Sequence, residues 1–121
     1  MYNDLILVAD DSPTELRIVV ETLRREGYQT ITATNGAEAL EKARRERPRL
    51  AILDIVMPKQ NGFQVTRQLK NTPDTKDIKV VLLSSKTQSS DRFWGIRQGA
   101  DEYLTKPFED EMLLETVARL Y

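Results

Sequence analysis

The chain has 121 residues, enough for one domain with its own core, and it contains neither cysteine nor histidine. These absences exclude disulfide scaffolds, thiol catalysis, cysteine-based zinc sites, the Ser-His-Asp triad and imidazole-bound metals. The 18 basic residues against 19 acidic ones give a net charge of −1, which disfavours nucleic-acid binding, because phosphate recognition needs a basic excess. Any chemistry must therefore come from carboxylates, hydroxyls and lysines.

Short apolar runs alternate with helix-like patterns along the whole chain. The runs suit strands buried on both faces, and they lie at residues 5–9, 30–33, 50–53, 80–83 and 102–105. Apolar residues at helical spacing lie at 16–23, 37–43, 63–69, 93–96 and 112–120. Before the first helix, Ser12 with Glu15 three positions later matches a capping box.

Strict alternation of strand and helix predicts a parallel sheet with helices on both faces. Five units are too few for an eight-stranded barrel, so we expect an open, doubly wound α/β sheet. Residues 1–121 show no linker and are expected to form a single domain without an effector domain. The first apolar run is too short for a signal segment or a membrane span, which favours a cytoplasmic protein without membrane insertion.

Polar residues follow four of the five strands directly: Asp10 and Asp11, Asp54, Ser84 and Lys106. The carboxyl ends of parallel strands share one edge, where ligands bind. Oxygen ligands without histidine or cysteine select a hard cation such as Mg²⁺, and a lysine with a hydroxyl complements a phosphoryl group. Asp54, alone after a wholly apolar strand, is the best candidate for a nucleophile that forms an aspartyl phosphate. Each residue by itself also fits a turn or cap, so the prediction depends on their coincidence.

Five motifs frame these residues: VADDS at 8–12, LDIVMP at 53–58 with NG at 61–62, LSS at 83–85, GADEY at 99–103 and KPF at 106–108. In order and spacing, over nearly the whole chain, they resemble the CheY-like receiver domain of two-component response regulators. The resemblance implies a flavodoxin-like sheet with strand order 2-1-3-4-5 and five helices. It also implies a phosphorylation-activated signalling switch.

The resemblance assigns a role to each residue at the strand ends. Asp54 would be the phosphoacceptor. Asp11, Asp54 and the backbone carbonyl of Val56 would ligate Mg²⁺ directly, and Asp10 would help through water. Lys106 would pair with the acidic pocket when it is empty and with the phosphoryl group when Asp54 is modified.

The resemblance also implies a switch. Ser84 would bind a phosphoryl oxygen and move toward it on activation, and Tyr103 would then swing inward, although by itself Tyr103 also fits a half-exposed strand aromatic. The Lys106–Pro107 peptide bond is expected to be cis. Val56 and Lys86 occupy positions that tune dephosphorylation, and an apolar Val56 is expected to restrict water and prolong the phosphorylated state.

Partners follow from the same resemblance. A sensor histidine kinase, CheA-like or hybrid, would donate the phosphoryl group, and a protein target would read the face of helix four, strand five and helix five. The chain would be no enzyme beyond its own phosphorylation and slow dephosphorylation. On helix four, Phe93, Ile96 and Ala100 are predicted to form a buried stripe, with Trp94 either at the edge of the core or serving as a partner anchor. Several motifs, including those around Trp94, look like the stand-alone regulators of type IV pilus twitching motility and phototaxis.

Other functions compete with the switch. A phosphohydrolase of the haloacid dehalogenase type needs a second aspartate two residues after the nucleophile, where this chain has Val56. A flavodoxin-like cofactor carrier needs a hydroxyl-rich phosphate loop after the first strand, where Asp10 and Asp11 would repel phosphate. A receiver kept only for docking would not need the five-residue site. The basic run at 42–49 is more typical of a solvated helix face than of a nucleic-acid site.

Overall fold

The computed structural model describes residues 2–85 and 89–121, and Lys86, predicted to tune dephosphorylation, lies outside them. Within these ranges strands and helices alternate. The strands are β1 (Asn3–Ala9), β2 (Thr30–Ala33), β3 (Pro48–Asp54), β4 (Lys79–Ser84) and β5 (Glu102–Thr105). The helices are α1 (Pro13–Arg25), α2 (Gly36–Glu46), α3 (Gly62–Lys70), α4 (Ser89–Arg97) and α5 (Asp110–Leu120).

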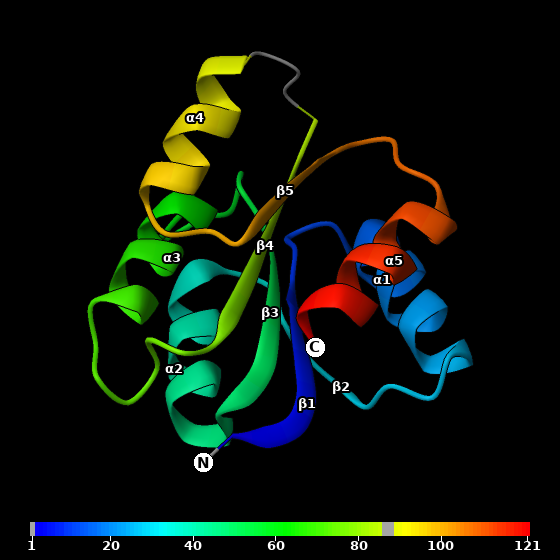
Figure 1. Ribbon diagram of the computed structural model, residues 1–121, viewed down its shortest axis with the longest axis horizontal. Coiled ribbons are helices and arrows are strands. Elements are labelled where there is room, and N and C mark those ends of the chain that lie inside the picture. Colours follow the sequence, from blue (N-terminus) through cyan, green and yellow to red (C-terminus); the bar gives the residue numbers. More distant parts are fainter. Residues whose placement is uncertain (1, 86–88) are drawn as a thin grey trace.

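The strands form one parallel sheet in the order β2-β1-β3-β4-β5 (Figure 1). Ala9 lies beside both Ala33 and Leu53, and Asp54 lies beside Leu83, so the carboxyl ends of the strands share one edge. The order and the five helices confirm the predicted doubly wound α/β fold.

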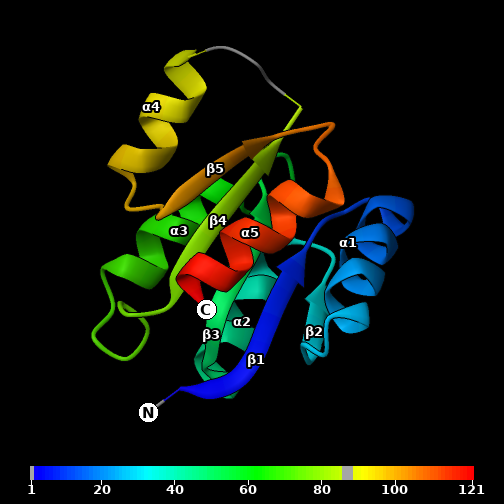
Figure 2. The ribbon, with the colours of Figure 1, turned by 45° about the vertical axis from the view of Figure 1, so that its right-hand side comes forward.

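The sheet lies between two helical layers (Figure 2). Side chains of α1 and α5 pack on one face, and side chains of α2 and α3 pack on the other, beside Tyr103 and Ala100. Both faces of the central strands are therefore covered, which explains why these strands are continuous apolar runs and do not alternate with polar residues. Burial of both faces leaves the strand ends as the places where polar side chains can gather.

Helix α1 begins differently from the prediction. Ser12 Oγ accepts a hydrogen bond from the backbone N of Glu15 at 3.3 Å, which is half of a capping box. The other half is wrong, because the backbone N of Ser12 donates to Asp10 Oδ1 at 2.9 Å and the Glu15 carboxylate pairs with Lys106. The aspartate of the strand end thus takes the place of the helix glutamate, which is left to enter the site.

The buried stripe predicted for α4 is wrong at Phe93 and Ile96, although Ala100 is buried as expected. Phe93 and Ile96 are 56% and 46% exposed, Trp94 is 54% exposed, and Gly95 is the buried residue of this turn. A Cβ on Gly95 would lie 3.0 Å from Leu82 and 3.2 Å from Tyr103. The helix therefore rests on its glycine, and the large apolar residues on either side are held away from the sheet.

The loop after β3 is fixed against the backbone of the sheet. Ile55 N donates to Leu83 O at 2.9 Å, and Gly62 N donates to Ile55 O at 2.9 Å. A Cβ on Gly62 would lie 2.7 Å from the carbonyl oxygen of Asp54, closer than real Cβ contacts. Only glycine lets the start of α3 approach the end of β3 this closely.

Replacing Gly62 with alanine should therefore destabilise the fold by about 2 kcal/mol, because the clash is with backbone that cannot turn aside. Urea unfolding followed by circular dichroism measures the change. Arg67→Ala on the exposed face of the same helix is the control and should change stability by less than about 0.5 kcal/mol. Equal stability of Gly62→Ala and the wild type would contradict the prediction.

Candidate functional site

Four of the strands, β1, β3, β4 and β5, each bring one or two polar residues of the predicted site to the shared edge. Asp10 and Asp11 follow β1, Asp54 ends β3, Ser84 ends β4 and Lys106 follows β5. Asp10, Asp54 and Ser84 are buried. The backbone N of Lys106 donates to the carbonyl of Ser84 at 2.6 Å, which joins the ends of the last two strands. The structure thus brings these predicted residues to one edge.

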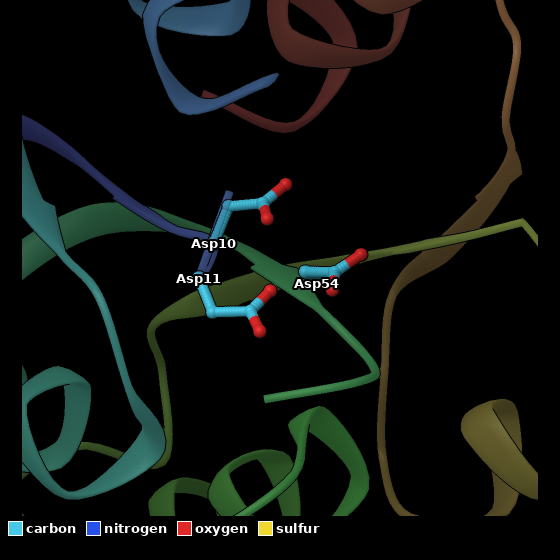
Figure 3. A group of neighbouring side chains, drawn as sticks. All are labelled: Asp10, Asp11 and Asp54. Carbon is cyan, nitrogen blue, oxygen red and sulfur yellow. The ribbon is translucent and has the colours of Figure 1, made fainter. Parts of the chain in front are cut away.

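The three aspartates form a compact cluster (Figure 3). Asp10, Asp11 and Asp54 each offer a carboxylate oxygen, and these oxygens lie within 4.8 Å of one another. Asp11 is exposed, whereas the other two are buried. Like charges this close repel unless a cation lies among them, and a donor set made of oxygen alone suits Mg²⁺.

Lys106 supplies one such cation. Its Nζ lies 2.9 Å from Asp54 Oδ1 and 3.0 Å from Asp10 Oδ2. It also lies 3.2 Å from Glu15 Oε1 on the first turn of α1. Sequence reasoning missed Glu15 as a site residue, because its place three positions after Ser12 was fully explained by a capping box. One signal was available, since Glu15 lies in the first turn of the helix that directly follows Asp10 and Asp11.

Burial and charge act in opposite directions on these groups. Burial is the largest cause that raises the pKa of the Asp54 carboxyl above its ordinary value; the hydrogen bond from Lys106 opposes this rise and the charge of Asp10 adds to it. Burial by itself would lower the pKa of Lys106, but its hydrogen bonds to Asp54 and Asp10 and the charges of these two carboxylates together outweigh burial. The pKa of Lys106 is therefore raised, and the group is an ammonium ion at neutral pH.

The predicted switch residues lie on the side of the sheet that leads to α4. Tyr103 is 2% exposed, so the interpretation as a half-exposed strand aromatic is wrong. The guanidinium of Arg92 lies 5.9 Å from the centre of the Tyr103 ring and donates to the backbone carbonyl of Tyr103 at 3.3 Å.

Two further predictions concern residues beside the aspartates. Val56 is 59% exposed beside the site. The Lys106–Pro107 peptide bond is cis.

The predicted partner face contains a groove of about 700 Å³, lined by β5, by the chain from β5 to α5, by α5 and by Arg92 of α4. Glu102 on β5 pairs with Arg92 of α4 at 3.2 Å and with Arg119 of α5 at 2.8 Å. One carboxylate therefore ties together the two helices that border the groove. Among the described helices, none has the length and apolar character needed to cross a membrane.

Comparison with known proteins decides the family. The response regulator receiver domain family matches residues 6–118. The chain belongs to this family. It is 46% identical over 112 residues to protein PilH of Pseudomonas aeruginosa, with 93% of each chain covered. It is 41% identical to the response regulator PleD of Caulobacter vibrioides, covering 95% of this chain but 25% of PleD.

Solved structures agree with this receiver's fold. The chemotaxis protein CheY4 of Vibrio cholerae is 33% identical, with a TM-score of 0.90 over 97% of this chain and 98% of that one. The receiver domain of a Pseudomonas aeruginosa sensor histidine kinase, 24% identical with a TM-score of 0.89, shares the fold and holds a magnesium ion in its own cleft. Receivers act as phosphorylation switches between a histidine kinase and downstream targets, and they bind Mg²⁺ at an acidic site such as the aspartate cluster seen here.

The raised pKa of Asp54 predicts how stability depends on pH. The folded state holds this proton more tightly than the unfolded chain, so the free energy of unfolding falls as pH rises from the ordinary aspartate range through the raised pKa. In EDTA at neutral pH, Asp54→Asn should therefore be more stable than the wild type and should unfold at a higher Tm. Below the ordinary pKa range of aspartate the difference should shrink.

Thermal unfolding across this pH range measures the effect. Asp77→Asn, which changes an exposed acid before β4, is the matched control. Its stability should differ from that of the wild type by the same amount at every pH in this range. An Asp54→Asn variant that is less stable than the wild type at neutral pH would show that the Lys106 contact outweighs the cost of burying the charge.

Proposed function

We propose that this receiver accepts a phosphoryl group on Asp54 from a sensor histidine kinase, with Mg²⁺ bound at the site. The observation that carries the proposal is the ammonium of Lys106, which joins Asp54 to Asp10 across the strand ends, beside Asp11. Phosphoryl transfer needs mainly positioning and neutralisation of charge, and this arrangement supplies both.

Asp54 is the nucleophile. A carboxylate oxygen of Asp54 forms a bond to phosphorus while the bond from phosphorus to the donor nitrogen breaks, and the departing imidazole takes up a proton. Lys106 then exchanges its contact with the Asp54 carboxylate for one with the new phosphoryl oxygens. Ser84, at the end of the neighbouring strand β4, donates a hydrogen bond from its hydroxyl group to another of these oxygens.

The donor set fits Mg²⁺, because it consists of carboxylate and carbonyl oxygens. Asp11, Asp54 and the backbone carbonyl of Val56 would hold the ion directly, and Asp10 would hold it through water. Bound there, the ion offsets the negative charge of the aspartates and of the incoming phosphoryl group. Asp10 also contacts Lys106, so it would link the metal ligands of the site to the lysine.

The output is a change in binding. Phosphorylation favours a pre-existing active arrangement in which Ser84 has moved toward the phosphoryl group and Tyr103, already buried in this structure, is held inward. The face of α4, β5 and α5 then presents a different surface to its protein target. Tyr103 lies under Arg92, which also pairs with Glu102 on this face. Arg92 contacts both Tyr103 and Glu102, so a change at the Tyr103 ring reaches the groove through Arg92.

The pathway follows from the likeness to PilH. We assign the chain to cytoplasmic signalling of the motility type, as a single receiver domain of residues 1–121 that catalyses only its own phosphorylation and slow dephosphorylation. Its partners are a CheA-like or hybrid kinase and a protein target, without nucleic acid or membrane insertion. The basic run at 42–49 supports the absence of nucleic acid, since Arg45, Arg47 and Arg49 all pair with acidic residues.

Incubation with Mg²⁺ and acetyl phosphate, followed by intact mass spectrometry, tests the proposal. The wild type should gain the mass of one phosphoryl group, because Asp54 is the nucleophile and Lys106 neutralises the group transferred. The gain should disappear in Asp54→Ala and in EDTA, and persist in the control Asp77→Ala. A wild type that takes up no phosphate in the presence of Mg²⁺ would favour a receiver kept only for docking.

The exposed Val56 predicts a slow loss of the phosphoryl group. An apolar side chain beside the acyl phosphate gives water no hydrogen-bond partner, whereas an amide would orient it for attack. Val56→Asn should therefore lose its phosphoryl group several-fold faster than the wild type, measured by intact mass after the donor is removed. Val56→Ile keeps the apolar character and should match the wild type, and equal lifetimes in all three proteins would contradict the prediction.

A further inference from the structure

Glu15 adds a fourth carboxylate to a site that already contains three aspartates. Its Oε1 lies 3.2 Å from Lys106 Nζ, the nitrogen that also lies 2.9 Å from Asp54 Oδ1. Because both oxygens contact the same nitrogen, the distance between Glu15 Oε1 and Asp54 Oδ1 is at most the sum of these two distances. The negative charge of Glu15 therefore acts at short range on any anion that approaches Asp54.

Glu15 also lies on the solvent side of this cluster. Its side chain is 49% exposed, whereas those of Asp10 and Asp54 are 3% and 10% exposed. Glu15 and Lys106 are also among the residues that line an apolar groove of about 400 Å³ between α1 and α5. The Glu15 carboxylate is therefore open to solvent while it contacts the nitrogen that also contacts Asp54.

We propose that Glu15 determines donor specificity by disfavouring small dianionic phosphodonors at Asp54. The proposal rests on the role of Asp54 as phosphoacceptor. Acetyl phosphate is a dianion at neutral pH, so a fixed negative charge beside Asp54 raises the free energy of its approach. Phosphoramidate has a protonated amino group and a smaller net charge, so it is repelled less. A donor carried by a protein can place a cation against Glu15 and remove the penalty.

The experiment compares second-order rate constants for phosphorylation by the two small donors, in saturating Mg²⁺, by intact mass. Glu15→Gln should raise the rate constant with acetyl phosphate by about threefold to tenfold, and with phosphoramidate by less. High salt should bring wild type and variant together, because it screens the exposed charge. Glu15→Asp keeps the charge and should keep the wild-type donor preference.

The matched control is Glu21→Gln. It removes an exposed carboxylate from the same helix, where Glu21 pairs with Arg17 at 2.9 Å, and it should leave both rate constants unchanged.

Three results would overturn the inference while Asp54 remains the acceptor. They are equal rate constants for Glu15→Gln and the wild type, an equal increase with both donors, and a Glu15→Asp variant that behaves like Glu15→Gln. The proposed function itself would fail, and this inference with it, if neither donor phosphorylates the wild type or any variant. The two failures are thus distinguished by whether the wild type gains mass.

Discussion

One ammonium group holds together the parts of this receiver that carry its chemistry. Lys106 contacts Asp10 after β1, Glu15 on α1 and Asp54 at the end of β3. With Asp11 nearby, the site has more negative charge than this lysine balances. An imbalance of this kind is costly in a partly buried place, and it explains why a divalent cation and a phosphoryl group can enter together. Under the proposed function, the cation would neutralise the aspartates, and the lysine would then be free to contact the phosphoryl oxygens.

The buried core of the fold offsets the cost of this imbalance of charge. Its strands are covered on both faces by helices, so the apolar residues of β1, β3 and β4 are buried almost completely. This burial is the main source of folding free energy. The residues that the strands contribute to the site lie at the last position of a strand or within the two positions after it, where the chain leaves the sheet. Stability and function thus occupy separate parts of the same strands, and the charged edge can be strained without loss of the core.

The sequence predicted the sheet and the charged edge because both depend on local patterns. Each apolar run ends abruptly in a polar residue, and parallel pairing brings those ends together wherever they lie in the chain. Glu15 could not be predicted in the same way, since its carboxylate had a choice between the nearby backbone of Ser12 and a lysine far along the chain. The stripe on α4 failed for a different reason. Helical periodicity does not reveal that Gly95, and not its apolar neighbours, makes the closest approach to the sheet.

The fixed backbone around Asp54 gives the site a direction. The strand end is held by Leu83 on one side and by the glycine contact of α3 on the other. When a bulky charged group is added to the Asp54 side chain, this backbone is an anchor that cannot retreat. The added volume would have to be accommodated by the neighbouring side chains, which include Lys106 after β5. Under the proposed function, a phosphoryl group on Asp54 would therefore act on Ser84 and Lys106, and the strands that carry them, β4 and β5, form the edge of the sheet on the α4 side.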